Sequence, residues 1–254
     1  MTIMMKRLSI LLILPLLFWA CDSEKAWDCI QDSGELVQQE YNVPLFKKIQ
    51  VWERVQLIIQ QGNTQTVRVQ TGANLINEVQ VVVEDSTLKV SDRNSCNYVR
   101  DYGITKVFVS SPDIREIRNS SGLTVESLGT LGFNELALIS DDPETLEIYH
   151  HDGDFDLDLD VVLLRVQSNG LSKFYLRGKA QYLGIRFDDG DPRLEGADLI
   201  VNNVNLFQRS TNKIIVNPQI SIKGQIRGLG DVIALNRPPI VEVEEFFRGR
   251  LIFQ

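Results

Sequence analysis

The sequence predicts an all-β fold: a single-stranded right-handed parallel β-helix, or β-solenoid, with coils of about 20 residues and capped ends. The first observation is that turns rich in Gly, Asn and Asp recur between Phe155 and Pro239, at 168–170, 188–190, 210–212 and 228–231. Second, short apolar strands separate these turns, and such a period is typical of stacked repeats. Third, no helical period extends beyond two turns after Cys21, and crossovers between parallel strands are strongly right-handed.

Composition indicates a folded and acidic protein. The chain has 254 residues, of which 43% are hydrophobic, so it can bury a sizeable core. It carries 26 basic against 34 acidic residues; without residues 1–20 the balance is 24 against 34, a net charge of −10. Because such a surface repels phosphate backbones, we expect no nucleic-acid partner.

Residues 1–20 are predicted to be a lipoprotein signal peptide. Two basic residues precede the apolar run Leu8–Leu17, which is too short to span a bilayer and is followed by polar sequence. The motif Leu17-Phe-Trp-Ala-Cys21 resembles the lipobox of bacterial lipoproteins, although its second and third residues depart from the usual pattern. We therefore expect lipidation of Cys21. The alternative is a plain secretory peptide that leaves this Cys unmodified.

Two cysteines remain in the exported chain, Cys29 and Cys96. In an oxidising compartment, two remaining thiols are more often a disulfide than a free pair. Closing a loop of about 68 residues would stabilise the fold by roughly 4 kcal/mol on the chain-entropy account. The alternative, a metal site, needs more ligands than two thiols, and no nearby His supplies them. We expect a disulfide and no metal.

The chain after the lipidation site reads as a tether followed by short strands. Residues 21–40 are polar and aperiodic, and order is expected to begin near Tyr41. Alternating apolar residues predict strands around 49–59, 67–69, 79–83, 88–90, 107–109, 114–117 and 123–139, separated by turn residues. Residues 72–77 could form a single helical turn. In this scheme the strands from Val43 to Val69 cap one end, and Phe246, Phe247 and the last apolar residues cap the other.

Several spaced motifs resemble one known family. They are Asp28-Cys29, Gly72-Ala-Asn-Leu75, Ser95–Tyr102, Glu116–Gly122, and Gly228-Leu-Gly-Asp-Val232 with Pro238. In this order they are similar to the putative auto-transporter adhesin, head GIN domain family, over about residues 45–240. The resemblance implies an envelope protein of Gram-negative bacteria, built as a right-handed β-helix of single coils, without an established biochemical activity. We assign residues 41–254 to a head GIN domain β-solenoid.

The segment Asp152–Asp160 places five aspartates at alternate positions. In a strand all five carboxylates point to one face, and Phe155, Leu157 and Leu159 point inward. Such a row suggests a calcium site, because hard cations take oxygen ligands. Side chains on a straight strand stand about 7 Å apart, however, too far to share one ion easily. The alternative, which we favour, is a solvated outer face.

Other candidates for chemistry are weak. His150 and His151 are the only histidines, and in a strand they point to opposite faces, so at most one could pair with Asp152 or Asp154 as a base. No Gly-x-Ser-x-Gly motif marks a nucleophile. The lone Gly228-Leu-Gly230 lacks the strand-to-helix setting of a phosphate loop. We therefore expect no catalytic residues and no cofactor.

A carbohydrate-active β-helix enzyme is the main enzymatic alternative. Its acid and base could come from two groups of aspartates, and its sugar-stacking rings from three tyrosines. These aspartates lie at predicted turns, where Asp is simply a good turn former. The residues are Asp141 with Asp142, the group Asp188, Asp189 and Asp191, and Tyr149, Tyr175 and Tyr182.

These observations favour an exported, lipid-anchored binding or adhesion scaffold without catalytic activity. We expect an outer-membrane lipoprotein in the bacterial cell envelope, facing either the periplasm or the exterior. Its partners would be the membrane, through the N-terminal lipid, and an unidentified protein or polysaccharide ligand, since solenoids present extended binding surfaces. A structural envelope component is a further alternative.

Overall fold

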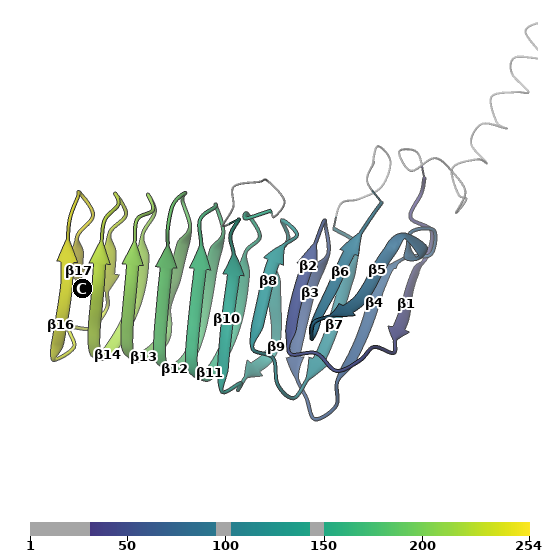
Figure 1. The fold of residues 1–254 in the computed structure, drawn as a ribbon, viewed down its shortest axis with the longest axis horizontal. Coiled ribbons are helices and arrows are strands. Elements are labelled where there is room, and N and C mark those ends of the chain that lie inside the picture. Colours follow the sequence, from purple (N-terminus) through teal and green to yellow (C-terminus); the bar gives the residue numbers. More distant parts are fainter. Residues whose placement is uncertain (1–30, 95–102, 143–149) are drawn as a thin grey trace, which may run out of the picture.

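The computed structural model describes residues 31–94, 103–142 and 150–254 of the chain. Within these ranges, seventeen strands and one short 3-10 helix form an elongated assembly in which all strands are linked by hydrogen bonds (Figure 1). No helix in this part of the chain is long and apolar enough to cross a bilayer.

The strands before residue 142 are short, and the next four are long. The early elements are β1 (Leu36–Tyr41), β2 (Lys48–Trp52), β3 (Gln56–Gln61), β4 (Thr66–Gly72), η3 (Ile76–Glu78), β5 (Val79–Glu84), β6 (Thr87–Asp92), β7 (Lys106–Ser111), β8 (Glu116–Ser120), β9 (Val125–Leu131) and β10 (Glu135–Ser140). The later ones are β11 (Phe155–Ser168), β12 (Lys173–Phe187), β13 (Arg193–Gln208), β14 (Ile214–Ile226), β15 (Val232–Ala234), β16 (Ile240–Glu245) and β17 (Leu251–Phe253).

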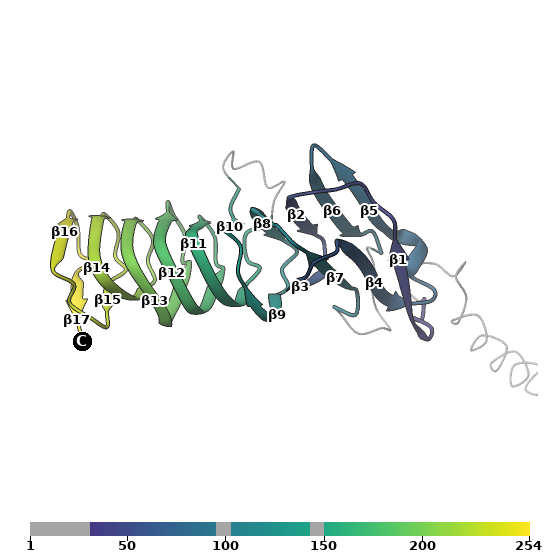
Figure 2. The same ribbon diagram turned by 90° about the horizontal axis from the view of Figure 1, so that it is seen from below.

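The pairings arrange these strands in two faces. The front sheet, which faces the viewer in Figure 1, runs β5–β6–β2–β8–β10 and continues through the second halves of β11–β14 to β16. The rear sheet runs β1–β4–β7–β3–β9, then through the first halves of β11–β14 to β15 and β17. Figure 2 shows the two faces from below, with β16 on one side, β15 and β17 on the other, and β14 passing through both.

The prediction of a single-stranded right-handed parallel β-helix over residues 41–254 is wrong. The fold is all-β, but its strands pair in both directions: β1–β4, β4–β7 and β5–β6 are antiparallel, and the remaining pairs are parallel. The order is also not sequential, because β2 lies between β6 and β8, and β3 pairs with both β7 and β9. Alternation of apolar residues predicts strands but not the direction in which they pair.

From β9 onward the pairing is parallel, and from β11 onward each strand segment returns to its neighbour after about 20 residues. This spacing follows from the recurring turns, because each turn sends the chain back to the start of the next segment. One register row, in which every member is buried or half-buried, consists of Val125, Phe155, Phe174, Leu194, Ile214, Val232 and Leu251.

Inward side chains of neighbouring segments stack on one another. Phe155, Leu157 and Leu159 are fully buried, as their alternation with aspartates predicts. The ring of Phe155 lies on that of Phe174, with centroids 4.9 Å apart and planes 9° apart, and Phe174 lies 5.9 Å from Phe187. In a parallel sheet, residues that are register partners on neighbouring strands lie about 4.8 Å apart. Side chains of similar shape at these positions therefore form continuous stacks.

Buried polar side chains hold the turns where the chain reverses. Asn119 is fully buried, and its Nδ2 donates to the carbonyl oxygens of Leu123 and Asp154 at 2.8 and 3.0 Å. Gln208, also fully buried, donates to the carbonyl oxygen of Asn212 at 2.6 Å and accepts from Ser210 Oγ at 2.8 Å. These bonds satisfy backbone groups that the turns would otherwise leave unpaired inside the protein.

A two-residue turn joins β5 to β6, where turn residues were expected between the strands at 79–83 and 88–90, and the two strands pair as an antiparallel hairpin. Asp85 and Ser86 both have positive φ, 48° and 59°. This geometry is that of the tight turns whose twist matches a pair of antiparallel strands. The single helical turn expected at 72–77 is present nearby as η3, Ile76–Glu78.

The two ends differ from the predicted caps. Order begins earlier than Tyr41, because β1 places residues 36–40 of the predicted tether in the rear sheet. β2 and β3, expected to cap one end, lie inside the stack. At the other end, Phe246 and Phe247 are exposed by 52% and 55%, so they do not close the core.

The ring stack predicts how stability responds to substitution. Phe174→Ala should lower the free energy of unfolding by about 3–5 kcal/mol, because it leaves a cavity between Phe155 and Phe187. Tyr175→Ala, one residue further on and pointing outward, should cost less than about 1 kcal/mol. Urea unfolding followed by circular dichroism measures both. Equal losses would contradict the inward and outward assignment.

Candidate functional site

The predicted lipidation and disulfide residues, Cys21, Cys29 and Cys96, lie outside the described residues, and so does Tyr149. Their assignment stays a prediction. The other candidates lie within the described ranges. They fall on the aspartate strand and just before it, in the turns, on the outer surface of the front sheet (Tyr182) and on that of the rear sheet (Tyr175).

The aspartate strand faces a basic strand. Asp156 and Asp158 point outward and are half-buried, and Asp160 is exposed. Arg177 Nη1 of the adjacent β12 lies 2.5 Å from Asp156 Oδ1, and Asp160 pairs in register with Lys179. Among the residues described, no group of three or more His, Cys, Asp or Glu is placed to hold a metal ion. One acid of the row is therefore paired with a cation of the neighbouring strand, and Asp158 accepts a hydrogen bond from Thr130 Oγ1 at 3.1 Å.

The histidines form no acid–base pair. His150 is exposed, whereas His151 is half-buried and its Nδ1 has no hydrogen-bond partner in the described part of the chain. The backbone of His151 holds the next turn, since Leu171 N–H donates to its carbonyl oxygen at 2.8 Å. Within residues 31–94, 103–142 and 150–254, no hydrogen bond or ion pair links either ring to a nucleophile or to Asp152 or Asp154.

The aspartates of the turn at 188–191 hold that turn and the next. Arg186 Nε donates to Asp188 Oδ2 at 2.7 Å, and Gly190 N–H donates to Asp189 Oδ1 at 2.8 Å. Asp191 accepts from Thr211 Oγ1 at 2.5 Å and from Asn212 Nδ2 at 3.1 Å. Each carboxylate thus has a structural partner, as expected of turn-forming Asp.

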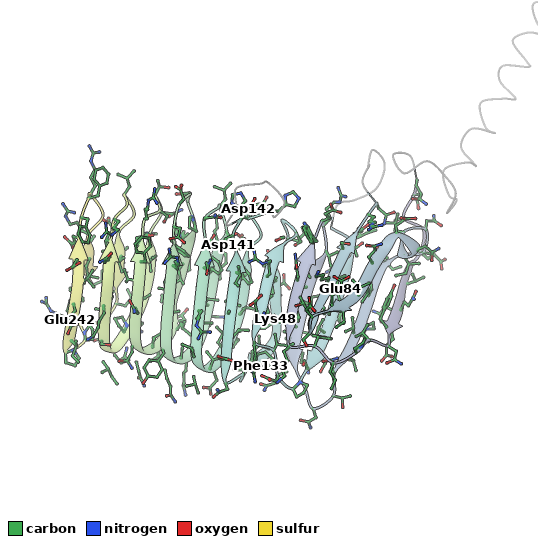
Figure 3. All side chains as sticks on the ribbon, viewed as in Figure 1. Lys48, Glu84, Phe133, Asp141, Asp142 and Glu242 are labelled. Carbon is green, nitrogen blue, oxygen red and sulfur yellow. The ribbon has the colours of Figure 1, made fainter. Side chains whose placement is uncertain are left out.

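Asp141 is the most buried of the candidate carboxylates, with 4% of its side chain exposed. Arg118 Nη1 donates to its Oδ1 and to its carbonyl oxygen, both at 2.8 Å, and Gln167 Nε2 donates to Oδ2. Asp142 donates its N–H to Asn169 Oδ1 at 3.0 Å. Figure 3 labels both aspartates, at the carboxyl end of β10.

The front sheet carries a shallow groove of about 860 Å³ across β11–β14. Gly184 interrupts its outward row: Arg165 and Asn205 are the register partners of Gly184, and Asn205 pairs in turn with Lys223. A Cβ at Gly184 would meet nothing closer than the carbonyl oxygen of Leu164, 4.0 Å away. Figure 3 labels Lys48 on β2 and Glu242 on β16, which lie on either side of these strands in the front sheet.

The groove is lined by three cations although the protein is acidic, and each of them lies within 4 Å of a carboxylate outside the lining. Arg165, Arg186 and Lys223 line it together with four amides, Gln167, Asn203, Asn205 and Gln225, and no Asp, Glu, His or Cys lines it. The guanidinium of Arg186 lies over the ring of Phe207, 5.2 Å from its centroid. The site can therefore bind an anion or a polar chain, but it lacks a carboxylate pair for acid–base catalysis.

Of the residues that line this groove, only Tyr182 was predicted from the sequence as a candidate for binding. The signal was present in the interrupted alternation Leu183-Gly-Ile185, where an outward position of a strand has no side chain. The sequence does not show that Arg165, Arg186 and Lys223 lie close together. They come from different strands, and only the register of the parallel pairs makes them neighbours.

The sequence of this chain matches one known family. The model of the family "Putative auto-transporter adhesin, head GIN domain" matches residues 45–238, about three quarters of the chain. The chain belongs to this family. The recognition made from the spaced motifs is confirmed. Among curated proteins no match was found.

Solved structures share the fold of this head GIN domain protein. A putative adhesin from Bacteroides fragilis is 23% identical, with a TM-score of 0.75, over 87% of this chain and 97% of that one. A putative lipid binding protein from Parabacteroides distasonis is 13% identical, with a TM-score of 0.60, over 86% and 97%. A putative adhesin from Parabacteroides merdae is 15% identical, with a TM-score of 0.54, over 87% and 97%. At these identities the likeness is one of fold.

The head GIN match includes the whole groove and both faces from β2 to β15. It leaves out β1, β16 and β17, which lie at the two ends of the assembly in Figure 1. The family thus indicates an adhesin-like, envelope-associated or extracellular protein.

The buried ion pair predicts a large effect at Asp141. Asp141→Ala should lower the free energy of unfolding by about 3–5 kcal/mol, because it leaves the guanidinium of Arg118 without its buried counterion. Asp156→Ala removes a carboxylate from a pair exposed by 44–48%, and should cost less than about 1 kcal/mol. Thermal and urea unfolding of both variants measure the difference. A loss at Asp141 no larger than at Asp156 would show that the pair is not structural.

Proposed function

We propose that this protein is an exported, lipid-anchored binding or adhesion scaffold of the bacterial cell envelope, without catalytic activity. The observation that carries the proposal is the groove on the front sheet, which combines cations, amides and an aromatic ring and has no carboxylate in its lining. It lies on a long parallel sheet, and extended, rigid surfaces of this kind suit the binding of large ligands. The adhesin-like family supports the same function.

The enzymatic alternative finds less support. A glycosidase needs two carboxyl groups about 5–10 Å apart on either side of a bound sugar. The aspartates that the sequence suggested lie at turns, where Asp141 is paired with Arg118 and Asp188 with Arg186. The groove, which could hold a sugar, has neither acid nor base among its lining residues.

The anchor is proposed at Cys21, at the end of the predicted signal peptide of residues 1–20. Two or three acyl chains on one residue would hold a protein stably at a membrane, whereas a single chain would not. Residues before β1 would then tether the folded part to the outer membrane. In this arrangement the front sheet stays free to face a ligand.

Metabolic labelling tests the anchor. Cells that produce the full chain should incorporate labelled palmitate into it, and Cys21→Ala should lose the label because acylation needs this thiol. Cys29→Ala serves as the matched control and should keep the label. Label that persists in Cys21→Ala would rule out this anchor.

Deletion of the gene from its host tests adhesion. Loss of the protein should reduce attachment of cells to polysaccharide-coated surfaces and leave sensitivity to detergent unchanged, and the full chain should restore attachment. Protease treatment of intact cells locates the protein in parallel, since a surface-exposed chain is clipped and a periplasmic one is not. Increased detergent sensitivity with normal attachment would favour a structural envelope component instead.

A further inference from the structure

Gly184 sits at an outward position in the middle of a strand, where glycine is unfavourable. It loses more backbone entropy than other residues there, which costs roughly 0.5–1 kcal/mol relative to Ala. Its φ is not among the positive values, so the backbone does not require glycine. No close neighbour requires it either, since a Cβ would meet nothing within 4.0 Å. What glycine provides here is open space over the sheet.

Arg186 is held beside this space in a fixed orientation. Its Nε donates to Asp188 Oδ2 at 2.7 Å, and its guanidinium lies over the ring of Phe207. The two Nη nitrogens have no partner among the described residues, and 60% of the side chain is exposed. A guanidinium presented in this way can donate two parallel hydrogen bonds to one carboxylate or sulfate group.

The other two cations have only exposed partners. Lys223 Nζ lies 2.8 Å from Glu242 Oε2, and Arg165 Nη1 lies 3.9 Å from Glu135 Oε2, with each side chain between 34% and 63% exposed. Exposed ion pairs contribute about 0–1 kcal/mol, so a ligand anion can replace them at little cost. The three cations therefore remain available in a chain whose net charge is −8.

The surroundings of the cations suit a sugar. Tyr182 is 52% exposed and lies two residues from Gly184 on the same strand, where its ring offers a flat surface to a pyranose. The amides of Gln167, Asn203, Asn205 and Gln225 can donate to and accept from hydroxyl groups. Arg165 and Lys223 are three strand steps apart, roughly 14 Å, so a ligand that contacts both must extend across the strands.

We propose that this groove binds a short segment of an acidic polysaccharide, with Arg186 holding a carboxylate and Tyr182 stacking on a sugar ring. The proposal rests on the binding function proposed above and names its ligand class. The groove is shallow, so it does not enclose an acyl chain. The acidic surface elsewhere on the protein repels a long polyanion such as nucleic acid, whereas a few charged sugars fit within the cationic patch.

Isothermal titration of the folded, lipid-free full chain with oligogalacturonates of four to six sugars tests the proposal. Arg186→Ala should weaken binding about 10- to 100-fold, because hydrogen bonds between charged groups contribute about 1.5–3 kcal/mol. Lys179→Ala is the matched control: it also removes one exposed cation from β12, but on the rear sheet, and should change the affinity less than about twofold. An equal loss in both variants would show unspecific attraction and overturn the proposal.

Gly184→Val provides a second test that does not depend on charge. Its side chain should fill the groove and abolish binding, while the melting temperature stays equal or rises, because Val suits a strand better than Gly. Unchanged binding in a folded Gly184→Val would overturn the proposal. So would equal affinity for neutral oligosaccharides, or binding to phosphatidylglycerol vesicles alone.

Attachment assays separate this inference from the proposed function. If deletion of the gene reduces attachment and both Arg186→Ala and Gly184→Val restore it as well as the unchanged chain, adhesion stands and the groove is not its site. If the purified protein binds oligogalacturonate through Arg186 but deletion leaves attachment unchanged, the groove binds acidic glycans and the adhesion function fails.

Discussion

The stacking of inward apolar side chains from one strand segment to the next is the interaction on which this structure depends. The stacking repeats along the long axis of the assembly, where Phe155, Phe174 and Leu194 occupy equivalent positions in neighbouring segments, and the ring of Phe174 also packs against Phe187. Because all the packing is internal, the outward positions are free to vary. Two features depend on this freedom. The outward residues are acidic on β11 but basic on β12, and the outward row has a gap at Gly184.

The sequence predicts the strands well and their pairing poorly. Alternation marks inward residues such as Leu157 and Leu159, and the recurring turns mark where the segments of β11–β14 reverse. Direction and order of pairing depend on contacts between distant segments, which carry no local signal. Nothing in the residues of β2 indicates that it lies between β6 and β8, and so the uniform coil expected from residue 41 does not exist in the first half.

The candidate site, too, could be predicted from the sequence only in part. Charged residues that looked functional, such as Asp141 and Asp188, hold turns, because Asp is common where the chain reverses. The groove is assembled from single residues of separate strands, Arg165, Arg186 and Lys223, which become neighbours only through the register. Residues about 20 apart in the sequence can become neighbours on adjacent strands. The register decides which of them do, and the register cannot be read from the sequence.

The insertion of β2 and β3 among later strands has a consequence for how the chain assembles. β2 pairs with β6 and β8, so its residues 48–52 have no partner on one side until the chain has continued to Ser91, and none on the other side until it has continued to Ser120. The hairpin of β5 and β6 can close early, because its contacts are local. During synthesis or export, the apolar residues of β2 and β3 therefore remain unpaired until the later strands have formed. In this period the polypeptide is most exposed to aggregation and proteolysis.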